Sequence, residues 1–191
     1  QQLAVDAELA VLTEALAYSV AGMLTTREFI VMATWYLCDH PELAEKYRTG
    51  GEDVQFGILE EILRLEPIVG VIVRRTTEDI DSPACGHIAS GTLLAMDVRY
   101  ANMDEKSVGA CPHAIDPARA KTSKAGSGFM SFGDGPHRCP GAQLALHEAR
   151  LFLHHLFQIP GLKLERAPDI AWYRPISGYE LHDAIITCDP G

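Results

Sequence analysis

Near its N-terminus the chain repeats apolar residues at spacings of three and four, which is typical of one face of a helix. The pattern predicts a long helix over residues 7–38, with Asp6 as its cap. This helix is expected to end at Asp39-His40-Pro41, because the residue before a proline disfavours helical dihedral angles. The apolar residues of the repeat are Leu9, Leu12, Leu16, Val20 and Met23.

Further along the chain, stretches of helical spacing alternate with short apolar runs. A buried strand is predicted over residues 68–73, and short strands with turns at Pro83 and Gly91 are predicted over residues 80–96. Residues 104–128 lack periodicity, and strand-like pieces follow residue 160. Together these patterns predict a mainly α fold with small β-sheets. The further helices are predicted over residues 41–48, 53–65 and 144–157.

The composition favours a globular protein with one sizeable core, since 47% of its 191 residues are hydrophobic. A net charge of −10 disfavours nucleic-acid binding. We find no signal peptide and no apolar run long enough to span a bilayer, so no membrane association is expected. The five scattered cysteines argue against a disulfide framework and for a reducing compartment, so a cytoplasmic location is expected.

One stretch near the C-terminus combines a cysteine with a glycine-rich loop and a following helix. Cys139 lies in this loop, and Pro140 suits the first position of the helix because that position needs no N–H donor. A sulfur atom at a helix N-terminus faces unpaired N–H groups and the positive end of the helix dipole, and both favour the thiolate. A lone thiolate can be a nucleophile, a metal ligand or an inert thiol. Zinc is disfavoured, because no second cysteine lies at the spacing of a zinc site.

The residues around Cys139 define the loop further. Its glycines let the backbone approach a flat and bulky group, and His137 and Arg138 place hydrogen-bond donors beside the sulfur. The pattern Phe-Gly-any-Gly-any-His-any-Cys-any-Gly resembles the haem-binding loop of the cytochrome P450 family at every fixed position. The resemblance implies that Cys139 is the axial ligand of haem b, iron protoporphyrin IX, through a thiolate that favours O–O cleavage. The other cofactor-binding residues implied in the loop are Phe132, Gly133, His137 and Gly141.

A second resemblance concerns the third predicted helix. Glu61 and Arg64 share one face of it and can pair, and in the cytochrome P450 family such a Glu-any-any-Arg pair is buried behind the haem loop. The resemblance implies the same structural role here. The family's third partner usually comes from a Pro-any-Arg-Phe element, which we place at Pro112-His113-Ala114-Ile115, where alanine replaces the arginine. Either His113 or Arg119 compensates, or the triad is weakened.

The long N-terminal helix contains Ala21-Gly22-Met23-Leu24-Thr25-Thr26, which is similar to the small-Gly-any-acid-Thr motif of the family's distal helix. The resemblance implies that Gly22 leaves space for bound oxygen and that Thr25 offers a hydroxyl for oxygen binding and proton delivery. Leu24 departs from the motif, because the family usually has an acid there and an apolar side chain cannot relay protons. Glu28, one turn further on, is an alternative acid. Without the resemblance, Thr25 is equally well explained by a hydroxyl that bonds back to its own helix.

Two further matches concern charged groups near the loop. Arg74 and His137 match the family's contacts to the haem propionates, and arginine suits this role because it pairs with carboxylates in a bidentate way. Arg138 and Arg150 offer positive charge to an acidic redox partner. A solvated helix end explains these two arginines equally well.

The resemblance covers nearly all of residues 1–191 but only the C-terminal half of the family's fold. We therefore interpret the chain as the C-terminal haem-binding portion of a cytochrome P450 domain, whose N-terminal half is absent from it. This portion comprises the long central helix, the Glu-any-any-Arg helix, the meander, the haem-cysteine loop and the helix after it. An apolar substrate is expected to contact Val69, Gly70 and Ile176.

Three hypotheses for function follow from the resemblance. The first is a haem-thiolate monooxygenase of the bacterial, soluble type, which inserts one oxygen atom from O2 into an apolar small molecule. Its electrons would come from a ferredoxin and its reductase or from a flavoprotein. Leu24 favours the second hypothesis, a peroxide-using or rearranging haem-thiolate enzyme, in which the proton relay matters less. The third is a truncated, non-catalytic module that binds haem or a partner.

Overall fold

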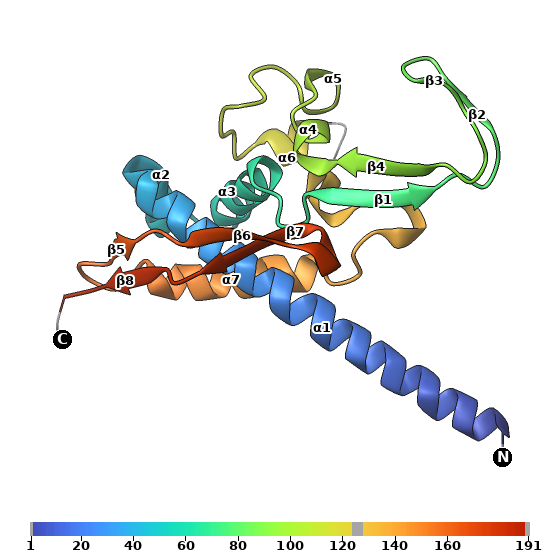
Figure 1. Ribbon diagram of the computed structural model, residues 1–191. Helices are drawn as coiled ribbons and strands as arrows, with labels where there is room; N and C mark the ends of the chain where they lie inside the picture. Colours follow the sequence, from blue (N-terminus) through green and yellow to red (C-terminus); the bar gives the residue numbers. More distant parts are fainter. Residues whose placement is uncertain (1, 124–127, 190–191) are drawn as a thin grey trace.

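The computed structural model describes residues 2–123 and 128–189. Helix α1 (Gln2–Asp39) is its longest element, and Figure 1 shows the N-terminal part of this helix projecting away from the rest of the molecule. The C-terminal part of α1 packs among the other long helices. All four predicted long helices are confirmed, although α1 begins earlier than expected. The other three are α2 (Pro41–Thr49), α3 (Glu52–Leu65) and α7 (Ala142–Leu156).

The core of the molecule lies where these four helices meet. Each helix contributes apolar side chains at spacings of three and four, so one face of every helix is shielded from water. Burying a large apolar side chain contributes about 1.5–3 kcal/mol, and this burial is the main term that stabilises the helices against one another. The buried side chains include Phe29, Met32 and Leu37 of α1, Tyr47 of α2, Ile58, Leu59 and Ile62 of α3, and Leu146 and Leu153 of α7.

The apolar repeat that predicts α1 lies outside this core. Its five residues are exposed, from 55% for Leu12 to 75% for Met23. Residues Glu8–Asp39 are long and apolar enough to cross a membrane, with a mean hydropathy of 1.4, so the expectation that no such run exists was wrong. Length and composition are weak evidence for a membrane span, because core helices of globular proteins pass the same test. The C-terminal part of α1 is such a core helix.

Four two-stranded antiparallel sheets accompany the helices in the described part of the chain. Figure 1 shows the β6–β7 hairpin lying across α1 and the β1–β4 pair reaching out beside it. The strand predicted over residues 68–73 begins later, at Val71, and of that run only Ile68 is buried. The pairs are β1 (Val71–Arg75) with β4 (Leu93–Asp97), β2 (Ile80–Ser82) with β3 (Gly86–Ile88), β5 (Lys163–Arg166) with β8 (Ile185–Thr187), and β6 (Asp169–Tyr173) with β7 (Gly178–His182).

The described residues between β4 and α7 form several short helical turns joined by irregular backbone, as the missing periodicity of the sequence predicts. The backbone polar groups of this segment therefore need partners outside helices and strands. The turns are α4 (Val98–Ala101), α5 (Glu105–Val108), α6 (Arg119–Thr122), η1 (Phe129–Phe132) and η2 (Gly135–His137), and a last one, η3 (Arg174–Ile176), joins β6 to β7.

The two ends of α1 should respond differently to truncation of a large side chain. Phe29 is buried, so Phe29→Ala should lower the free energy of unfolding by about 3–5 kcal/mol through lost burial and a cavity. Leu12→Ala, on the projecting part of the same helix, should change it by less than about 0.5 kcal/mol. Urea unfolding followed by far-UV circular dichroism measures both, and equal losses would contradict the assignment of the core.

Candidate active site

Cys139 ends a tight loop that one backbone hydrogen bond closes. The N–H of Cys139 donates to the carbonyl of Phe132 at 2.8 Å. The side chain of Cys139, which lies between this loop and α7, is exposed. Gly133 and Gly135 have φ angles of 69° and 65°, in the left-handed region that glycine adopts without steric cost. The chain therefore reverses its direction between Phe132 and Cys139. The hydrogen bond to Phe132 fixes the backbone of Cys139, while its sulfur lies at the surface.

The sulfur lies beside the start of α7, but the helix begins later than predicted. Its first residue is Ala142 and its cap is Gly141, so Pro140 precedes the helix and is not its first residue. A Cβ atom on Gly141 would lie 4.0 Å from Cys139 Sγ. The sulfur is thus in contact distance of the cap, where the first N–H groups of the helix lack partners within it.

The other cysteines are poorer candidates for a thiolate ligand. All five are free thiols, and Cys38 is half-buried in α1. Burial, and after it the charge of Asp39, raises the pKa of the Cys38 thiol, which keeps it protonated. Cys85, Cys111 and Cys188 are exposed like Cys139, but Cys139 alone of these sits beside the start of a long helix.

Strand β1 lies against the Cys139 loop. A Cβ atom on Gly133 would lie 4.0 Å from Ile72 Cδ1 of β1. Arg74 is two residues further along the strand, so its side chain leaves the same face as that of Ile72. It is exposed, and its Nη1 donates to the carbonyl of Val73 at 2.9 Å. His137, inside the loop, is exposed as well.

The residues expected to contact a substrate come together at one junction. Val69 forms an isolated bridge with Gly178, and the N–H of Gly70 donates to the carbonyl of Ser177 at 2.9 Å. A Cβ atom on Gly178 would lie 3.2 Å from Ile176 Cδ1 and only 2.2 Å from the carbonyl oxygen of Ile68, so a larger residue would force the junction apart. Their contact with a substrate stays a prediction.

Two polar residues of α1 that the sequence offers for an oxygen site, Thr25 and Glu28, form hydrogen bonds within the protein. Thr25 Oγ1 donates to the carbonyl of Ala21 at 2.7 Å, which is the back-bonding that the sequence offered as the alternative explanation. A Cβ atom on Gly22 would meet nothing within 4 Å. Glu28 is 0% exposed, and its Oε2 accepts from the N–H of Leu181 at 2.7 Å while its Oε1 pairs with Arg27. Glu28 thus fastens β7 to α1, and its use as an alternative acid stays a prediction.

The Glu-any-any-Arg pair is formed and fully buried. Arg64 Nε and Nη2 donate to the two carboxylate oxygens of Glu61 at 2.7 and 2.9 Å. The third partner is Arg119, whose Nε donates to Glu61 Oε2 at 3.1 Å. It belongs to Pro117-Ala118-Arg119, which lies further along the chain than the expected element. Of the alternatives that the sequence left open, the one in which Arg119 compensates for Ala114 is therefore confirmed, and the Pro-any-Arg spacing of Pro117-Ala118-Arg119 is the signal that could have singled it out.

The expected element contributes backbone carbonyls instead of a side chain. Arg64 Nη1 donates to the carbonyl of Pro112 at 2.6 Å, and Nη2 of Arg64 and of Arg119 both donate to that of Ala114, at 3.2 and 3.1 Å. Arg119 Nη1 also donates to the carbonyl of Val108 at 2.8 Å. The two guanidinium groups thus neutralise one carboxylate and satisfy the carbonyls of an irregular segment. His113 is exposed and takes no part.

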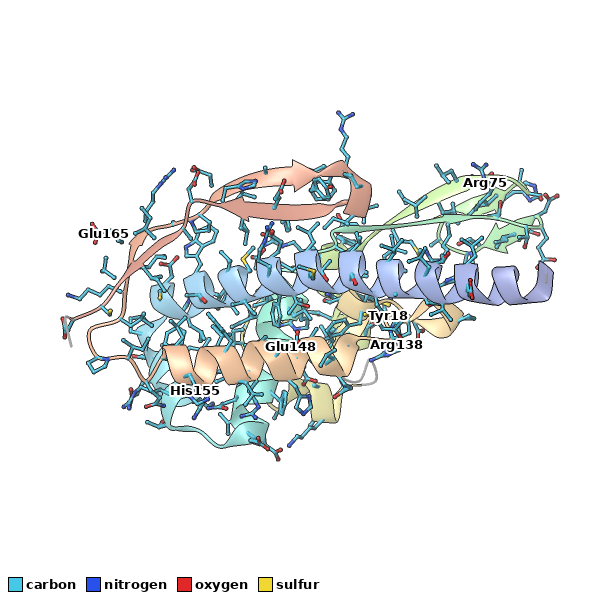
Figure 2. The ribbon with its side chains drawn as sticks, turned by 90° about the horizontal axis from the view of Figure 1, so that it is seen from below. Tyr18, Arg75, Arg138, Glu148, His155 and Glu165 are labelled. Carbon is cyan, nitrogen blue, oxygen red and sulfur yellow. The ribbon has the colours of Figure 1, made fainter. Side chains whose placement is uncertain are left out.

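Arg150 does not offer a surface charge to a partner, contrary to expectation. Only 8% of it is exposed. Its Nη2 pairs with Glu52 at 2.7 Å, its Nη1 donates to Gln55 Oε1 at 3.2 Å, and its guanidinium lies over the ring of Phe56. Arg138, in contrast, is exposed at the cysteine loop, and Figure 2 shows its side chain at the start of α7, the helix that runs beside α1.

Comparison with known proteins identifies the family. A family model described as Cytochrome P450 matches residues 57–166, which is more than half of the chain and contains the triad, β1 and the cysteine loop. The chain therefore belongs to the cytochrome P450 family. It is similar to the biotin biosynthesis cytochrome P450 of Bacillus subtilis (strain 168), with 33% identity over 84% of this chain and 38% of that protein. It is also 35% identical to the plant-inducible cytochrome P450-pinF1 of Rhizobium radiobacter, over 80% of this chain and 33% of the relative.

Solved structures agree on the fold. The crystal structure of CalO2 matches 92% of this chain with a TM-score of 0.77 and 25% identity. That of P450BioI, in complex with an acyl carrier protein that carries hexadec-9Z-enoic acid, matches 89% with a TM-score of 0.74 and 29% identity. Each match covers 42% of the other protein, so the chain spans about two-fifths of these structures. A cytochrome P450 fold portion, mainly α with small sheets, is thereby confirmed.

The buried triad should stabilise the fold far more than an exposed pair of the same spacing. Glu61→Gln leaves two buried guanidinium groups without their carboxylate, so the free energy of unfolding should fall by about 3–5 kcal/mol. Glu45 and Arg48 form a matched control, since they also lie three residues apart on a helix but are exposed. Glu45→Gln should leave the urea midpoint nearly unchanged. Equal losses in the two variants would show that burial of the triad does not matter.

Proposed function

We propose that this chain is the haem-thiolate portion of a monooxygenase, which inserts one oxygen atom from O2 into an apolar small molecule. The observation that carries the proposal is the position of Cys139. Its backbone is tied to Phe132, while its sulfur is exposed beside the start of α7. The family membership of the chain supports the same chemistry.

The residues present fit a haem group. In the described part of the chain no three His, Cys, Asp or Glu side chains converge, so Cys139 supplies a single sulfur donor. One donor suits an iron ion that a porphyrin ring already holds by four nitrogens and would leave a zinc ion short of ligands. A Cβ atom on Gly141 would lie 4.0 Å from Cys139 Sγ, so the missing side chain at Gly141 keeps the exposed sulfur open to a flat ring. Bound haem would supply the activation of O2, which a thiolate axial ligand favours.

Other residues would hold and orient the group. Arg74 leaves the face of β1 that meets the loop, so its guanidinium can pair with a propionate, and His137 can donate to the second one. Phe132 would pack beside the ring. Glu61 and Arg64 brace the segment behind the loop.

We also infer an apolar substrate, an electron donor and a location for the protein. The junction of Val69, Gly70 and Ile176 offers apolar contacts. The P450BioI structure holds an acyl carrier protein with a fatty acyl group, which supports an apolar substrate. Electrons would come from a ferredoxin and its reductase or from a flavoprotein. The five free thiols support a cytoplasmic location, and the net charge of −10 disfavours nucleic acid as a partner.

A carbon monoxide spectrum tests thiolate ligation directly. The chain, reconstituted with haem, reduced and exposed to carbon monoxide, should show the red-shifted Soret band of thiolate-ligated haem. Cys139→Ala should abolish the shift. Cys188→Ala removes another exposed cysteine and is the matched control that should keep it. An unshifted band in the unaltered chain would reject the proposal.

A second candidate is a peroxide-using or rearranging enzyme, and α1 favours it. Leu24 cannot carry a proton, the hydroxyl of Thr25 is bonded to Ala21, and the carboxylate of Glu28 is bonded to Leu181. No acid of this stretch is therefore placed to deliver protons during reduction of O2. Hydrogen peroxide already carries the two protons and two electrons that O2 would have to gain, so its use needs neither a proton relay nor an electron donor.

The substitution Leu24→Asp separates the two candidates. If proton delivery limits the O2-driven reaction, the new carboxyl should raise coupled turnover with NAD(P)H, a ferredoxin and its reductase by about tenfold or more. Turnover driven by peroxide should not change. Leu12→Asp adds the same charge to an exposed part of α1 and should alter neither rate. Unchanged coupling in Leu24→Asp would refute the relay argument, and a shifted Soret band without turnover by either oxidant would favour a non-catalytic haem-binding module.

A further inference from the structure

We infer that Asn102 is a positioning residue for Cys139, acting through the turn η1 that precedes the cysteine loop. Neither Asn102 nor its partner Ser131 belongs to the site derived above. The inference rests on the proposed function only for what Cys139 binds; the hold on the loop is a property of the protein alone.

The side-chain amide of Asn102 is buried, with 1% of the residue exposed, and it is fully engaged. Its Nδ2 donates to the carbonyl of Arg64 at 3.1 Å and to Ser131 Oγ at 2.9 Å, and its Oδ1 accepts from the N–H of Met130 at 2.8 Å. The orientation of the amide is fixed, because a backbone carbonyl only accepts and a backbone N–H only donates. A flipped amide would break the bonds to Arg64 and Met130.

Ser131 completes the connection to α3. Its hydroxyl donates to the carbonyl of Leu63 at 2.8 Å, so its oxygen is left to accept from Asn102. Leu63 and Arg64 lie in the last turn of α3, where carbonyls have no partner within the helix. Asn102 and Ser131 therefore satisfy two of these carbonyls. In return, Arg64 Nη1 donates to the carbonyl of Asn102 at 3.1 Å.

The turn that they hold is strained and needs such support. Phe129 has a φ angle of 48°, in the left-handed region that non-glycine residues rarely adopt. Such a residue persists only where its surroundings determine the backbone. The guanidinium of Arg64 lies over the ring of Phe129 at 5.6 Å, and Asn102 binds the next N–H, that of Met130.

One backbone hydrogen bond connects the turn η1 to Cys139. Phe132 ends η1, and its carbonyl accepts the N–H of Cys139 at 2.8 Å. The position of the sulfur is thus set by a short path from the rigid end of α3, through Asn102 and η1, to the loop. Without Asn102 the turn would be held to α3 only by the hydroxyl of Ser131 and by the contact between Arg64 and Phe129.

Hydrogen exchange of the haem-free chain, resolved by mass spectrometry, tests this path. Asn102→Ala should speed exchange of the amides of η1 and of Cys139 by about ten- to a hundredfold, the effect expected for a lost buried hydrogen bond. Ser131→Ala removes one link only and should give a smaller increase at the same amides. It also keeps the test decisive if Asn102→Ala fails to fold.

Gln55→Ala is the matched control. Gln55 is an equally buried amide of α3, at 1% exposure, and it binds the carbonyl of Tyr47, His154 and Arg150 at the far side from the loop. The Gln55→Ala substitution should destabilise the protein as a whole. The amides of the Cys139 loop should then exchange no more quickly, relative to the unaltered chain, than the amides of α7 do. If Ser131→Ala leaves loop exchange unchanged, or if Gln55→Ala speeds it as much as Asn102→Ala does, the inference is wrong.

The haem-loaded protein separates this inference from the proposed function. With carbon monoxide, Ser131→Ala and Asn102→Ala should convert part of the red-shifted Soret band to the unshifted form, since a mobile sulfur is more easily lost from iron, whereas Gln55→Ala should keep the band. An unshifted band in the unaltered chain would reject thiolate ligation and leave the exchange result standing. A full shift in all variants, with unchanged exchange, would reject the positioning role alone.

Discussion

The fold depends on one carboxylate that is removed from water. Glu61 meets the guanidinium groups of Arg64 and Arg119, and all three side chains are buried. Burying an ion costs several kcal/mol, which close opposite charges and complete hydrogen bonding must offset. Both conditions hold, because the N–H groups that do not bind Glu61 donate to carbonyls of the irregular segment before α7. The cluster thus supplies the hydrogen bonds that helices or strands would provide elsewhere.

The region around Cys139 and the projecting part of α1 differ in how far their side chains and backbone groups contact the rest of the protein. Around Cys139, backbone and side-chain hydrogen bonds account for each turn, and the last carbonyls of α3 are bonded to Asn102 and Ser131. Along the projecting part of α1, large apolar side chains such as Leu16 and Val20 face water. Most large apolar side chains of α1 before Thr25 are therefore not stabilised by burial within this chain. The chain spans about two-fifths of its structural relatives.

Helix α1 shows how a neighbour can change the role of a residue. Glu28 and Thr25 are polar residues within one turn of each other, and the sequence offers both for moving protons. Packing against β7 assigns Glu28 to a buried backbone N–H, and the helix itself occupies the hydroxyl of Thr25. Both oxygens of the Glu28 carboxylate are thus occupied in holding β7 and Arg27 to α1.

Local patterns were enough for the long helices, since the spacing of apolar residues and Pro41 report on the chain within a few residues. The cysteine loop is also a local feature, because its glycines permit the positive φ angles that reverse the chain beside α7. Sequence alone therefore determined the family, the mainly α character and the candidate ligand.

Only the tertiary structure decided which residues support the fold and the cysteine loop. Arg119 joins Glu61 from far along the chain, Arg150 turns inward to Glu52, and Asn102 connects α3 to η1. The sequence offered Arg119 only as one of two alternatives and did not show the other two contacts, because these join segments that lie far apart in sequence and meet only when the chain folds. The apolar repeat of α1 shows the same limit: periodicity shows that a helix has an apolar face, and only its neighbours decide whether that face is covered.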